Sequence, residues 1–337
     1  MKKRFVLSGY YGFKNFGDEA ILSVLVNKLQ QNKDSVTVIS SNPDYTKSLY
    51  KHIRAIKTFD FNNIIPAIYK SDILISGGGS LLQDVTSLKS LIYYLLIIFI
   101  ALFFRKKVII FAQGIGPINS RFGEFFTKVL LKNCTYISVR DKKSHELMQQ
   151  WGINSDLLCD PIFSLNVPDN SKNKTVAIQL RNCKGMSNDF LDRLADSVSK
   201  NFSDFNIEIY SFQDSIDLDI CKTFEQNINM LNPEIKTTVL SEMSNNEIIE
   251  SLSKSEYLIS MRFHAIIIGL LAGVKTLGIN YDIKVEKLAK EFNLPLIDLK
   301  NDFGNNFELL KSQDLGLIRD KISQINFDWT GFENTVI

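Results

Sequence analysis

The sequence predicts an α/β protein with two doubly wound domains, and three observations support this fold class. Short apolar runs that are typical of buried strands alternate with helical patterns along most of the 337 residues. Several of these runs end in glycines or in a charged residue, as strands do at the ligand-binding edge of an open α/β sheet. A polar stretch with a proline, residues 167–174, separates two such series and is predicted to be a linker. We therefore expect domains at residues 1–170 and 171–337 that face one another across a cleft.

The first series begins with a glycine-rich turn. Five strands are predicted, at residues 4–8, 36–40, 72–76, 108–112 and 136–139. The turn after the first strand contains Gly12 and Gly17, and Asp18 and Glu19 follow where the first turn of a helix favours carboxylates. The glycine spacing is not that of a dinucleotide-binding turn, so no nicotinamide site is predicted. The sequence leaves open whether this turn only connects two elements or also contacts a ligand.

Two further strand ends in this series are rich in glycine. Gly78 and Gly79 follow the third strand, and Gln113 and Gly114 follow the fourth. Such glycines can let main-chain N–H groups approach a substrate, or can only let chain segments cross, and both interpretations stay open. Arg140 follows the fifth strand directly and is expected on the same edge.

Residues 91–104 form the most apolar segment of the chain, and the basic residues 105–107 follow it. The segment has fourteen residues, whereas a helix that crosses a bilayer needs about twenty. It is therefore predicted not to span a membrane. Two interpretations remain: a helix buried in the core, or a helix that lies on a membrane surface with its basic end against anionic headgroups.

The second series places three basic side chains at strand-to-helix turns. Its strands are predicted at residues 176–180, 207–212, 257–260, 274–279 and 295–299, with a helix at 188–200. Arg262 and His264 lie between the third strand and an apolar helix, and Arg181 follows the first strand. Asp282 is the predicted N-cap of the next helix, which puts Lys284 in its first turn.

Arg262, His264 and Lys284 together predict an anion site with a base beside it. A cation in the first turn of a helix is unfavourable unless an anion joins it, because that end of the helix carries partial positive charge. The same charge favours the neutral form of an imidazole, so His264 is expected to act as a base or hydrogen-bond partner. Each residue alone would most simply be a solvated surface residue.

Composition excludes several functions. The net charge is +2, and no long basic run with interleaved aromatic residues occurs, so no nucleic-acid partner is expected. The four cysteines are far apart without a CxxC pair, so neither a metal site nor a disulfide framework is predicted. Reduced thiols indicate a cytoplasmic protein. The apolar run after the basic N-terminal residues is too short for a signal peptide.

Taken in order, the motifs resemble those of the polysaccharide pyruvyl transferase family, in particular its branch that acts on cell-wall polymers. They are GYYGFKNFGDEAIL at 9–22, ISGGGSLLQD at 75–84, AQGIGP at 112–117, SVRDKKS at 138–144, SMRFHAIIIGLLAGV at 260–274 and NYDIKV at 280–285. The resemblance covers most of the chain, and the order of the motifs is more specific than any one of them. It implies two Rossmann-like domains in a GT-B-like arrangement and no required metal.

The resemblance also implies a reaction. A pyruvyl group would pass from phosphoenolpyruvate to two hydroxyls of one sugar, giving a cyclic ketal and phosphate. Phosphoenolpyruvate would be a substrate, and no cofactor is expected. In the cell-wall branch the acceptor is N-acetylmannosamine on an undecaprenyl-diphosphate-linked glycan, used in the synthesis of a secondary cell-wall polymer. Such an acceptor implies a location at the inner face of the plasma membrane, with peripheral contact through residues 91–107.

Site roles follow from the same resemblance. His264 matches the catalytic base, Arg262 and Lys284 match donor-site positions, and Arg140 and Arg181 are further donor-binding candidates. Domain 171–337 is expected on the phosphoenolpyruvate side, with a C-terminal tail that packs back on the first domain. Domain 1–170 is the expected acceptor side, with candidate contacts from Gly12, Gly17, Asp18, Glu19, Gly78, Gly79, Gln113 and Gly114.

Two other functions fit parts of the same pattern. A GT-B-type glycosyltransferase that uses a nucleotide sugar also needs cations for a diphosphate. A catalytically silent scaffold at the membrane surface would need the apolar segment but not the three basic residues. The second alternative does not explain why all three lie at neighbouring helix starts.

Overall fold

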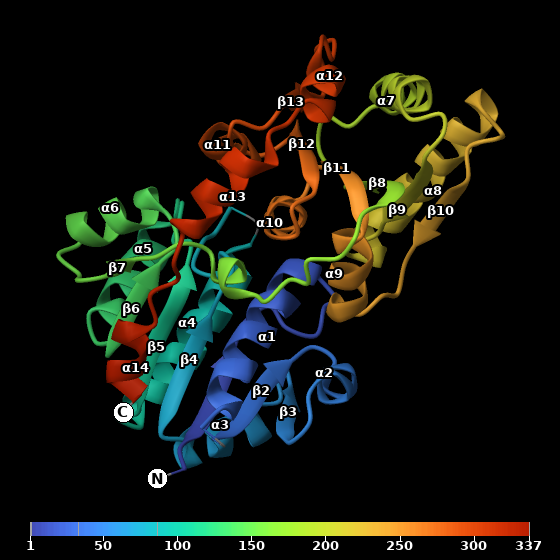
Figure 1. The fold of residues 1–337 in the computed structure, drawn as a ribbon. Helices are drawn as coiled ribbons and strands as arrows, with labels where there is room; N and C mark the ends of the chain where they lie inside the picture. The colour runs from blue at the N-terminus through green and yellow to red at the C-terminus, as the bar shows by residue number, and fades with distance from the viewer. Residues whose placement is uncertain (1, 33, 86, 337) are drawn as a thin grey trace. The chain divides into compact units, whose positions relative to one another are not determined.

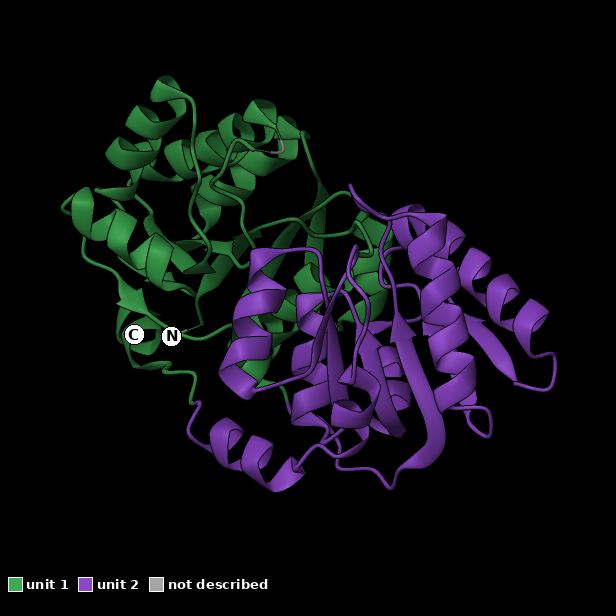
Figure 2. Cartoon of the chain, turned by 90° about the horizontal axis from the view of Figure 1, so that it is seen from above, with its two compact units in different colours: residues 1–165, 326–337 green, residues 166–325 purple. Residues whose placement is uncertain are grey.

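The structure is a computed structural model, and it describes residues 2–32, 34–85 and 87–336 (Figure 1). The chain forms two compact units, which Figure 2 shows in different colours. Unit 1 contains Met1–Leu165 and Asn326–Ile337, and unit 2 contains Asn166–Ile325. The expected boundary after residue 170 lies a few residues beyond the observed one, and the end of the chain belongs to unit 1.

Unit 1 is built around a seven-stranded parallel sheet in the order β3-β2-β1-β4-β5-β6-β7. The order reverses between β1 and β4, so the carboxyl ends of these two strands form the switch point at which open α/β sheets bind ligands. The strands are β1 Arg4–Ser8, β2 Ser35–Ser40, β3 Ile53–Lys57, β4 Ile73–Gly77, β5 Lys107–Gln113, β6 Tyr136–Val139 and β7 Asp156–Leu157.

Helices cover both faces of this sheet because its central strands are apolar on both sides. Val6 and Leu74 point to the face that α3, α4 and α5 cover, whereas their neighbours in sequence point to the face under α1 and α14 (Figure 1). The helices are α1 Phe16–Gln30, α2 Pro43–Leu49, α3 Phe61–Lys70, α4 Leu88–Phe103, α5 Arg121–Leu131, α6 Lys142–Gln150, the 3₁₀ helix η1 Pro161–Ser164 and α14 Thr330–Val336.

The C-terminal tail packs on the sheet of unit 1 through aromatic side chains. The ring of Phe111 on β5 lies 5.4 Å from the ring of Trp329 and 5.5 Å from that of Phe332, measured between centroids. Lys107 donates a hydrogen bond of 2.9 Å from Nζ to the carbonyl oxygen of Thr335. Burial of these rings explains why the tail belongs to unit 1. The sequence had assigned the tail to the second domain, with the expectation that it packs back on the first.

Unit 2 contains a six-stranded parallel sheet in the order β10-β9-β8-β11-β12-β13. Its switch point lies between β8 and β11. The strands are β8 Asn173–Gln179, β9 Asn206–Tyr210, β10 Thr237–Leu240, β11 Ser255–Ser260, β12 Lys275–Asn280 and β13 Leu296–Asp298. The helices are α7 Asn188–Asn201, α8 Asp214–Leu231, α9 Asn245–Ser253, α10 Phe263–Leu271, α11 Ile283–Phe292, α12 Asn306–Lys311 and α13 Leu315–Ser323.

Helix α10 lies very close to the sheet of unit 2, and a glycine makes this approach possible. A Cβ atom on Gly269 would lie 2.6 Å from Leu258 Cδ2 and 2.9 Å from Thr276 Oγ1. The helix also contacts α9, α11 and α13. The start of α10, with Arg262 as N-cap and His264 in the first turn, is therefore packed tightly at the carboxyl end of β11.

The sequence located most strands, and the three that it missed are edge strands. β3, β7 and β10 each lie at the end of a sheet order. Apart from the buried Ile56 of β3, their side chains are exposed or partly buried, so these strands lack the continuous apolar run of a central strand. The α/β class with two doubly wound parallel sheets is confirmed.

The apolar segment 91–104 forms most of α4. One side of the helix is in the core of unit 1, whereas the other side carries exposed apolar residues. Within the described ranges, no helix combines the length and the apolar character that crossing a membrane requires. The two interpretations of this segment are thus compatible, because each concerns a different side of the helix.

Candidate functional site

The switch point of unit 2 brings Arg181 and Arg262 together. Gln179 at the end of β8 pairs with Ser260 at the end of β11, and each arginine lies two residues beyond its strand. The backbone N–H of Arg262 donates to Gln179 Oε1 at 2.8 Å and to Ser260 Oγ at 3.1 Å. The side chain of a buried strand-end residue therefore fixes the turn that carries the second arginine.

The guanidinium of Arg262 is held by a buried carboxylate that the sequence analysis did not identify. Arg262 Nε lies 3.0 Å from Asp217 Oδ2, and Arg262 Nη2 lies 2.8 Å from Asp217 Oδ1. Arg262 is 7% exposed and Asp217 is fully buried. The backbone N–H of Gln213 also donates to Asp217 Oδ2, at 3.1 Å. This fork-like pair fixes the orientation of the guanidinium and compensates part of its charge.

Asp217 was missed because its position in the sequence has a simpler explanation. It lies in the first turn of α8, where a carboxylate is expected for its favourable interaction with the helix dipole. Burial raises the pKa of the Asp217 carboxyl, and the charges of Arg262 and Arg181 oppose that shift. Asp217 is therefore close to both arginines, and the only sequence signal for it is an acidic residue at a helix start.

Tyr281 is a second residue of this cluster that the sequence analysis left without a role. It follows β12 and precedes Asp282 in the NYDIKV motif. Burial raises the pKa of the Tyr281 hydroxyl, and the nearby guanidinium groups of Arg181 and Arg262 lower it in part. The turns after β8, β11 and β12 thus contribute to one polar cluster.

His264 and Lys284 lie in the first turns of α10 and α11, as predicted. Asp282 caps α11 because its Oδ1 accepts a hydrogen bond of 2.9 Å from the backbone N–H of Lys284. Lys284 is exposed, whereas His264 is partly buried, with its ring edge-on to Phe263 at 5.2 Å. Because β11 and β12 are neighbours, both helix starts lie at the same edge of one sheet. The chemical roles of the two residues stay predictions.

The switch point of unit 1 is formed by tightly packed glycine turns. Gly12 has φ of +80°, and a Cβ atom there would lie 2.1 Å from Ser40 Oγ. Its backbone N–H donates to Glu19 Oε1 at 2.7 Å. Burial raises the pKa of Glu19 to about 7, although the hydrogen bond from Gly12 acts in the opposite direction. The buried side chain of Glu19 therefore stabilises the backbone of the turn that contains Gly12.

The turns after β1 and β4 meet at this switch point. A Cβ atom on Gly79 would lie 2.8 Å from Asp18 Oδ1, so these residues are in direct contact. Gly78 has φ of +62° and leaves room for Ile21 of α1. Gly17 is buried in the first turn of α1. Asp18 and Gly79, like Gly12 and Glu19, are therefore predicted residues that the fold brings together here.

The polar side chains at the carboxyl ends of β5 and β6 form hydrogen bonds with other side chains of unit 1. Gln113 Nε2 donates to Ser76 Oγ at 2.8 Å. Arg140 Nη1 lies 2.6 Å from Asp160 Oδ2, and Arg140 Nη2 donates to Ser80 Oγ at 3.2 Å. The arginine side chain is 8% exposed. A Cβ atom on Gly114 would lie 2.7 Å from Ser80 Oγ.

The two further arginines that were predicted to bind the donor thus lie in different units. Arg181 belongs to the same cluster as Arg262, whereas Arg140 belongs to unit 1 and is paired with a buried aspartate. Arg140 was missed as an ion-pair residue because Asp160 follows it in sequence only after a helix and a further strand.

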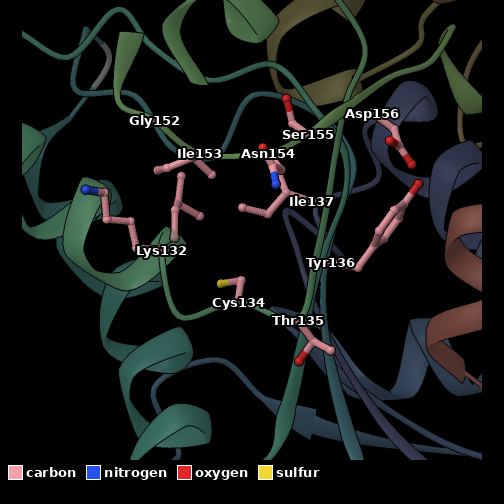
Figure 3. A pocket seen from close by; sticks show the side chains of 11 residues that line it. Lys132, Cys134, Thr135, Tyr136, Ile137, Gly152, Ile153, Asn154, Ser155 and Asp156 are labelled. Carbon is pink, nitrogen blue, oxygen red and sulfur yellow. The ribbon is translucent and has the colours of Figure 1, made fainter. Parts of the chain in front are cut away.

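A separate hollow of about 390 Å³ lies at the opposite edge of the unit 1 sheet. It is formed at the amino ends of β6 and β7, where the side chains of Tyr136 and Asp156 point toward one another (Figure 3). Open α/β sheets bind ligands at the carboxyl ends of their strands. The candidate site is therefore assigned to the switch points and not to this hollow. In the part of the chain that the structure describes, no group of three His, Cys, Asp or Glu side chains could hold a metal ion.

Solved structures with similar folds span nearly the whole chain. The Anabaena protein Alr3699/HepE in complex with UDP and glucose has a TM-score of 0.62 and 12% identity, and the match covers 99% of this chain and 98% of that one. S. aureus MnaA with UDP has a TM-score of 0.65 and 11% identity, with 99% and 95% covered. A glycosyltransferase from Rickettsia africae has a TM-score of 0.61 and 15% identity, with 99% and 97% covered. These likenesses confirm the GT-B-like fold class.

Comparison of sequences gives the family. No curated protein sequence matches the chain. The profile of a family described as "Polysaccharide pyruvyl transferase" matches residues 15–283. This range includes the switch point of unit 2 and the turn after β4, begins after the turn that contains Gly12, and ends directly before Lys284. The chain therefore belongs to the polysaccharide pyruvyl transferase family, as its motifs predicted.

Proposed function

We propose that the protein transfers the pyruvyl group of phosphoenolpyruvate to two hydroxyls of one sugar, with formation of a cyclic ketal and release of phosphate. The family supports pyruvyl transfer to a polysaccharide. The main support for phosphoenolpyruvate as the donor is a charged cluster at the switch point of unit 2, next to the first turns of α10 and α11. It consists of Arg181, Arg262 and Asp217.

The charges of this cluster suit an enol phosphate. Two guanidinium groups and one carboxylate leave a net positive charge, and the ammonium of Lys284 and two helix starts add to it. Phosphoenolpyruvate carries both a carboxylate and a phosphate, which arginine recognises through charge-assisted hydrogen bonds. Asp217 keeps Arg262 in one orientation, so little conformational entropy is lost when the donor binds.

The reaction needs proton transfers as well as anion binding. Protonation of the methylene carbon gives a cationic centre, which the first sugar hydroxyl attacks. Loss of phosphate restores the cationic centre, and attack by the second hydroxyl closes the ketal. Of the two hydroxyl protons, one balances the proton added to carbon and one leaves with phosphate or solvent. His264, in the first turn of α10, is our candidate for the base that removes a hydroxyl proton.

We assign the acceptor to unit 1, in agreement with the glycine-rich turns at its switch point. Close packing around Gly12 and Gly79 leaves main-chain groups rather than long side chains at this edge. The acceptor that fits the cell-wall branch of the family is N-acetylmannosamine on an undecaprenyl-diphosphate-linked glycan. No cofactor enters the proposed reaction.

A direct assay tests the donor. The purified protein is incubated with phosphoenolpyruvate and a lipid-linked acceptor, and phosphate release and an acidic ketal product are measured together. We expect both, in equal amounts. Release of a nucleotide from a nucleotide sugar, without any ketal, would instead support the glycosyltransferase alternative. The UDP complexes among the similar structures are the reason to include that arm, although their likeness concerns the fold alone.

A further inference from the structure

Helices α4 and α5 of unit 1 present aligned exposed apolar stripes. On α4 the stripe includes Ile92, Phe99 and Phe103, which recur at helical spacing. On α5 it includes Phe122, Phe125 and Val129, again on one side of the helix. Phe103 is 70% exposed, and Phe122 and Phe125 are each 61% exposed. We call these six residues the apolar surface.

The two stripes lie side by side because the helices pack closely. A Cβ atom on Gly123 of α5 would lie 2.9 Å from Leu91 Cδ2 of α4. The opposite sides of both helices are in the core of unit 1, so the exposed stripes are not needed to cover the sheet. Contiguous exposed apolar residues of this kind mark an interaction site rather than ordinary surface.

Charge around the apolar surface is strongly biased. Residues 88–107 and 121–132 contain seven basic residues and one acidic residue, whereas the whole chain has 39 basic and 37 acidic residues. The single acid, Glu124, accepts a hydrogen bond of 3.2 Å from Trp151 Nε1 and so has a partner within the protein. The basic residues are Lys89, Arg105, Lys106, Lys107, Arg121, Lys128 and Lys132.

The end of α4 places two of these cations, Arg105 and Lys106, directly beside the apolar stripe, whereas Lys107 begins β5 and bonds to the C-terminal tail. Arg105 has φ of +55°, and the backbone N–H of Lys106 returns to the carbonyl oxygen of Ala101 at 2.9 Å. The chain therefore turns sharply at Arg105 instead of continuing along the helix axis. Apolar side chains next to a basic rim are typical of elements that lie in the interface of an anionic bilayer.

We propose that the apolar surface docks unit 1 on a membrane that contains anionic lipid. Phe99, Phe103 and Phe125 would enter the headgroup region, while the basic residues contact lipid phosphates. A second copy of this chain is disfavoured as the occupant, because two such positively charged surfaces would repel one another. Docking would give access to a lipid-linked acceptor, and this purpose rests on the proposed function. Membrane binding itself can be tested without the reaction.

Vesicle flotation of the full chain tests the proposal. We expect the protein to float with vesicles of phosphatidylcholine and phosphatidylglycerol, and much less with phosphatidylcholine alone or at high salt. The double variant Phe103→Ser with Phe125→Ser should lose most of this binding. The control Met230→Ser with Leu317→Ser replaces exposed apolar residues of unit 2 and should bind like the unaltered protein.

A second pair of variants tests the charge. Arg105→Gln with Arg121→Gln should weaken binding at least about tenfold, since each basic residue near an anionic surface contributes about a factor of five. Lys222→Gln with Lys236→Gln changes the net charge equally in unit 2 and should have little effect. Unchanged melting temperatures would show that all variants are folded.

Three results would overturn the proposal. They are failure of the unaltered protein to float, equal flotation with and without anionic lipid, and retained binding by the apolar-surface variant. Conversion of a dimer to a monomer by that variant, without any lipid binding, would identify a second copy as the occupant and also reject the proposal. Pyruvyl transfer to a soluble sugar fragment should persist in the variants, so failure of the reaction and failure of docking are distinguishable.

Discussion

The two switch points occupy the same place in similar sheets, yet their chemistry is opposite. In unit 1 the turns after β1 and β4 are glycine-rich, and the buried carboxyl of Glu19 supports them from within. In unit 2 the turns after β8 and β11 carry Arg181 and Arg262, and a buried carboxylate orients a guanidinium. The same topology therefore supports a glycine-rich edge with an acidic side chain, Asp18, in one unit and a cationic edge in the other.

This contrast teaches that sheet topology fixes where a ligand binds but not which ligand binds. A buried acidic side chain is present at both switch points, and its hydrogen-bond partner decides whether it stabilises a backbone turn or orients a cation. Glu19 has backbone N–H partners, whereas Asp217 has a guanidinium. Substitutions at the switch point of unit 2 should therefore affect catalysis and donor binding. Substitutions at the switch point of unit 1 should mainly affect the stability of the turn.

The largest effect is expected from His264→Ala. Loss of a general base typically costs a factor of about 10² to 10⁴ in rate, so kcat for phosphate release should fall within that range while the protein stays folded. His145→Ala is a matched control, since His145 lies in unit 1 and its ring forms hydrogen bonds with the side chains of Ser155 and Gln149. Near-normal turnover of folded His264→Ala would remove this residue from the mechanism.

Asp217→Ala should be the most destabilising change at the unit 2 switch point. It leaves the buried guanidinium of Arg262 without its carboxylate, which costs about 3–5 kcal/mol for pairs of this kind. Urea unfolding would measure the loss in free energy. The exposed pair of Lys200 and Asp196 provides the control, because Asp196→Ala should cost less than about 1 kcal/mol. Equal costs would show that the Asp217 pair is not a special feature of the site.

Glu19 should make stability depend on pH. Its pKa is raised to about 7 in the folded protein from an ordinary value of 4.5, so the folded state binds more protons between these values. Stability should therefore fall as pH rises from about 4.5 to 7, by about 3 kcal/mol in total. Glu19→Gln should remove most of this slope in urea unfolding at pH 5 and pH 8. An unchanged slope would assign it to other groups.

Arg181→Gln and Arg140→Gln compare the two units directly. Loss of a charge-assisted hydrogen bond costs about 1.5–3 kcal/mol, so Arg181→Gln should raise the KM for phosphoenolpyruvate about 10- to 100-fold. Arg140 lies in unit 1 and pairs with Asp160, so its variant should leave that KM nearly unchanged. Initial rates at varied phosphoenolpyruvate concentration would give the KM of each variant. A similar rise in both variants would mean that donor binding is not confined to unit 2.

The smallest effect is expected from Gly12→Ala, which tests the turn in unit 1. The substitution combines strain at a φ of +80° with a contact of 2.1 Å to Ser40 Oγ, and we expect a loss of about 1–3 kcal/mol in unfolding free energy. Gly152→Ala is the control, since Gly152 also has positive φ but no atom within 4 Å of the added Cβ. Equal losses would show that backbone strain alone limits this position.

Local signals in the sequence predicted much of the fold. Strand β6 was located at its observed bounds, and the predicted cap formed by Asp282 is present. These features depend on residues that are close in sequence, so a short window contains their physical cause. The edge strands β3, β7 and β10 were missed because they have no continuous apolar run, whereas the edge strand β13 was predicted at residues 295–299.

The candidate site was predicted only in part. The positions of Arg262, His264 and Lys284 at helix starts followed from the apolar runs on either side of them. The partner of Arg262 did not, because Asp217 is 45 residues away and resembles an ordinary helix-start carboxylate. Likewise, nothing local indicated that Arg140 would pair with Asp160.

The sequence by itself determined the alternation of strands and helices, the caps and the family, because each depends on the order of residues along the chain. The tertiary structure decided which strand ends are neighbours, which aromatic contacts hold the C-terminal tail, and which side of α4 stays exposed. These outcomes depend on how much apolar area each arrangement buries and on which distant charges meet. The orientation of Arg262 by Asp217 and the exposed stripes of α4 and α5 are therefore properties of the folded chain.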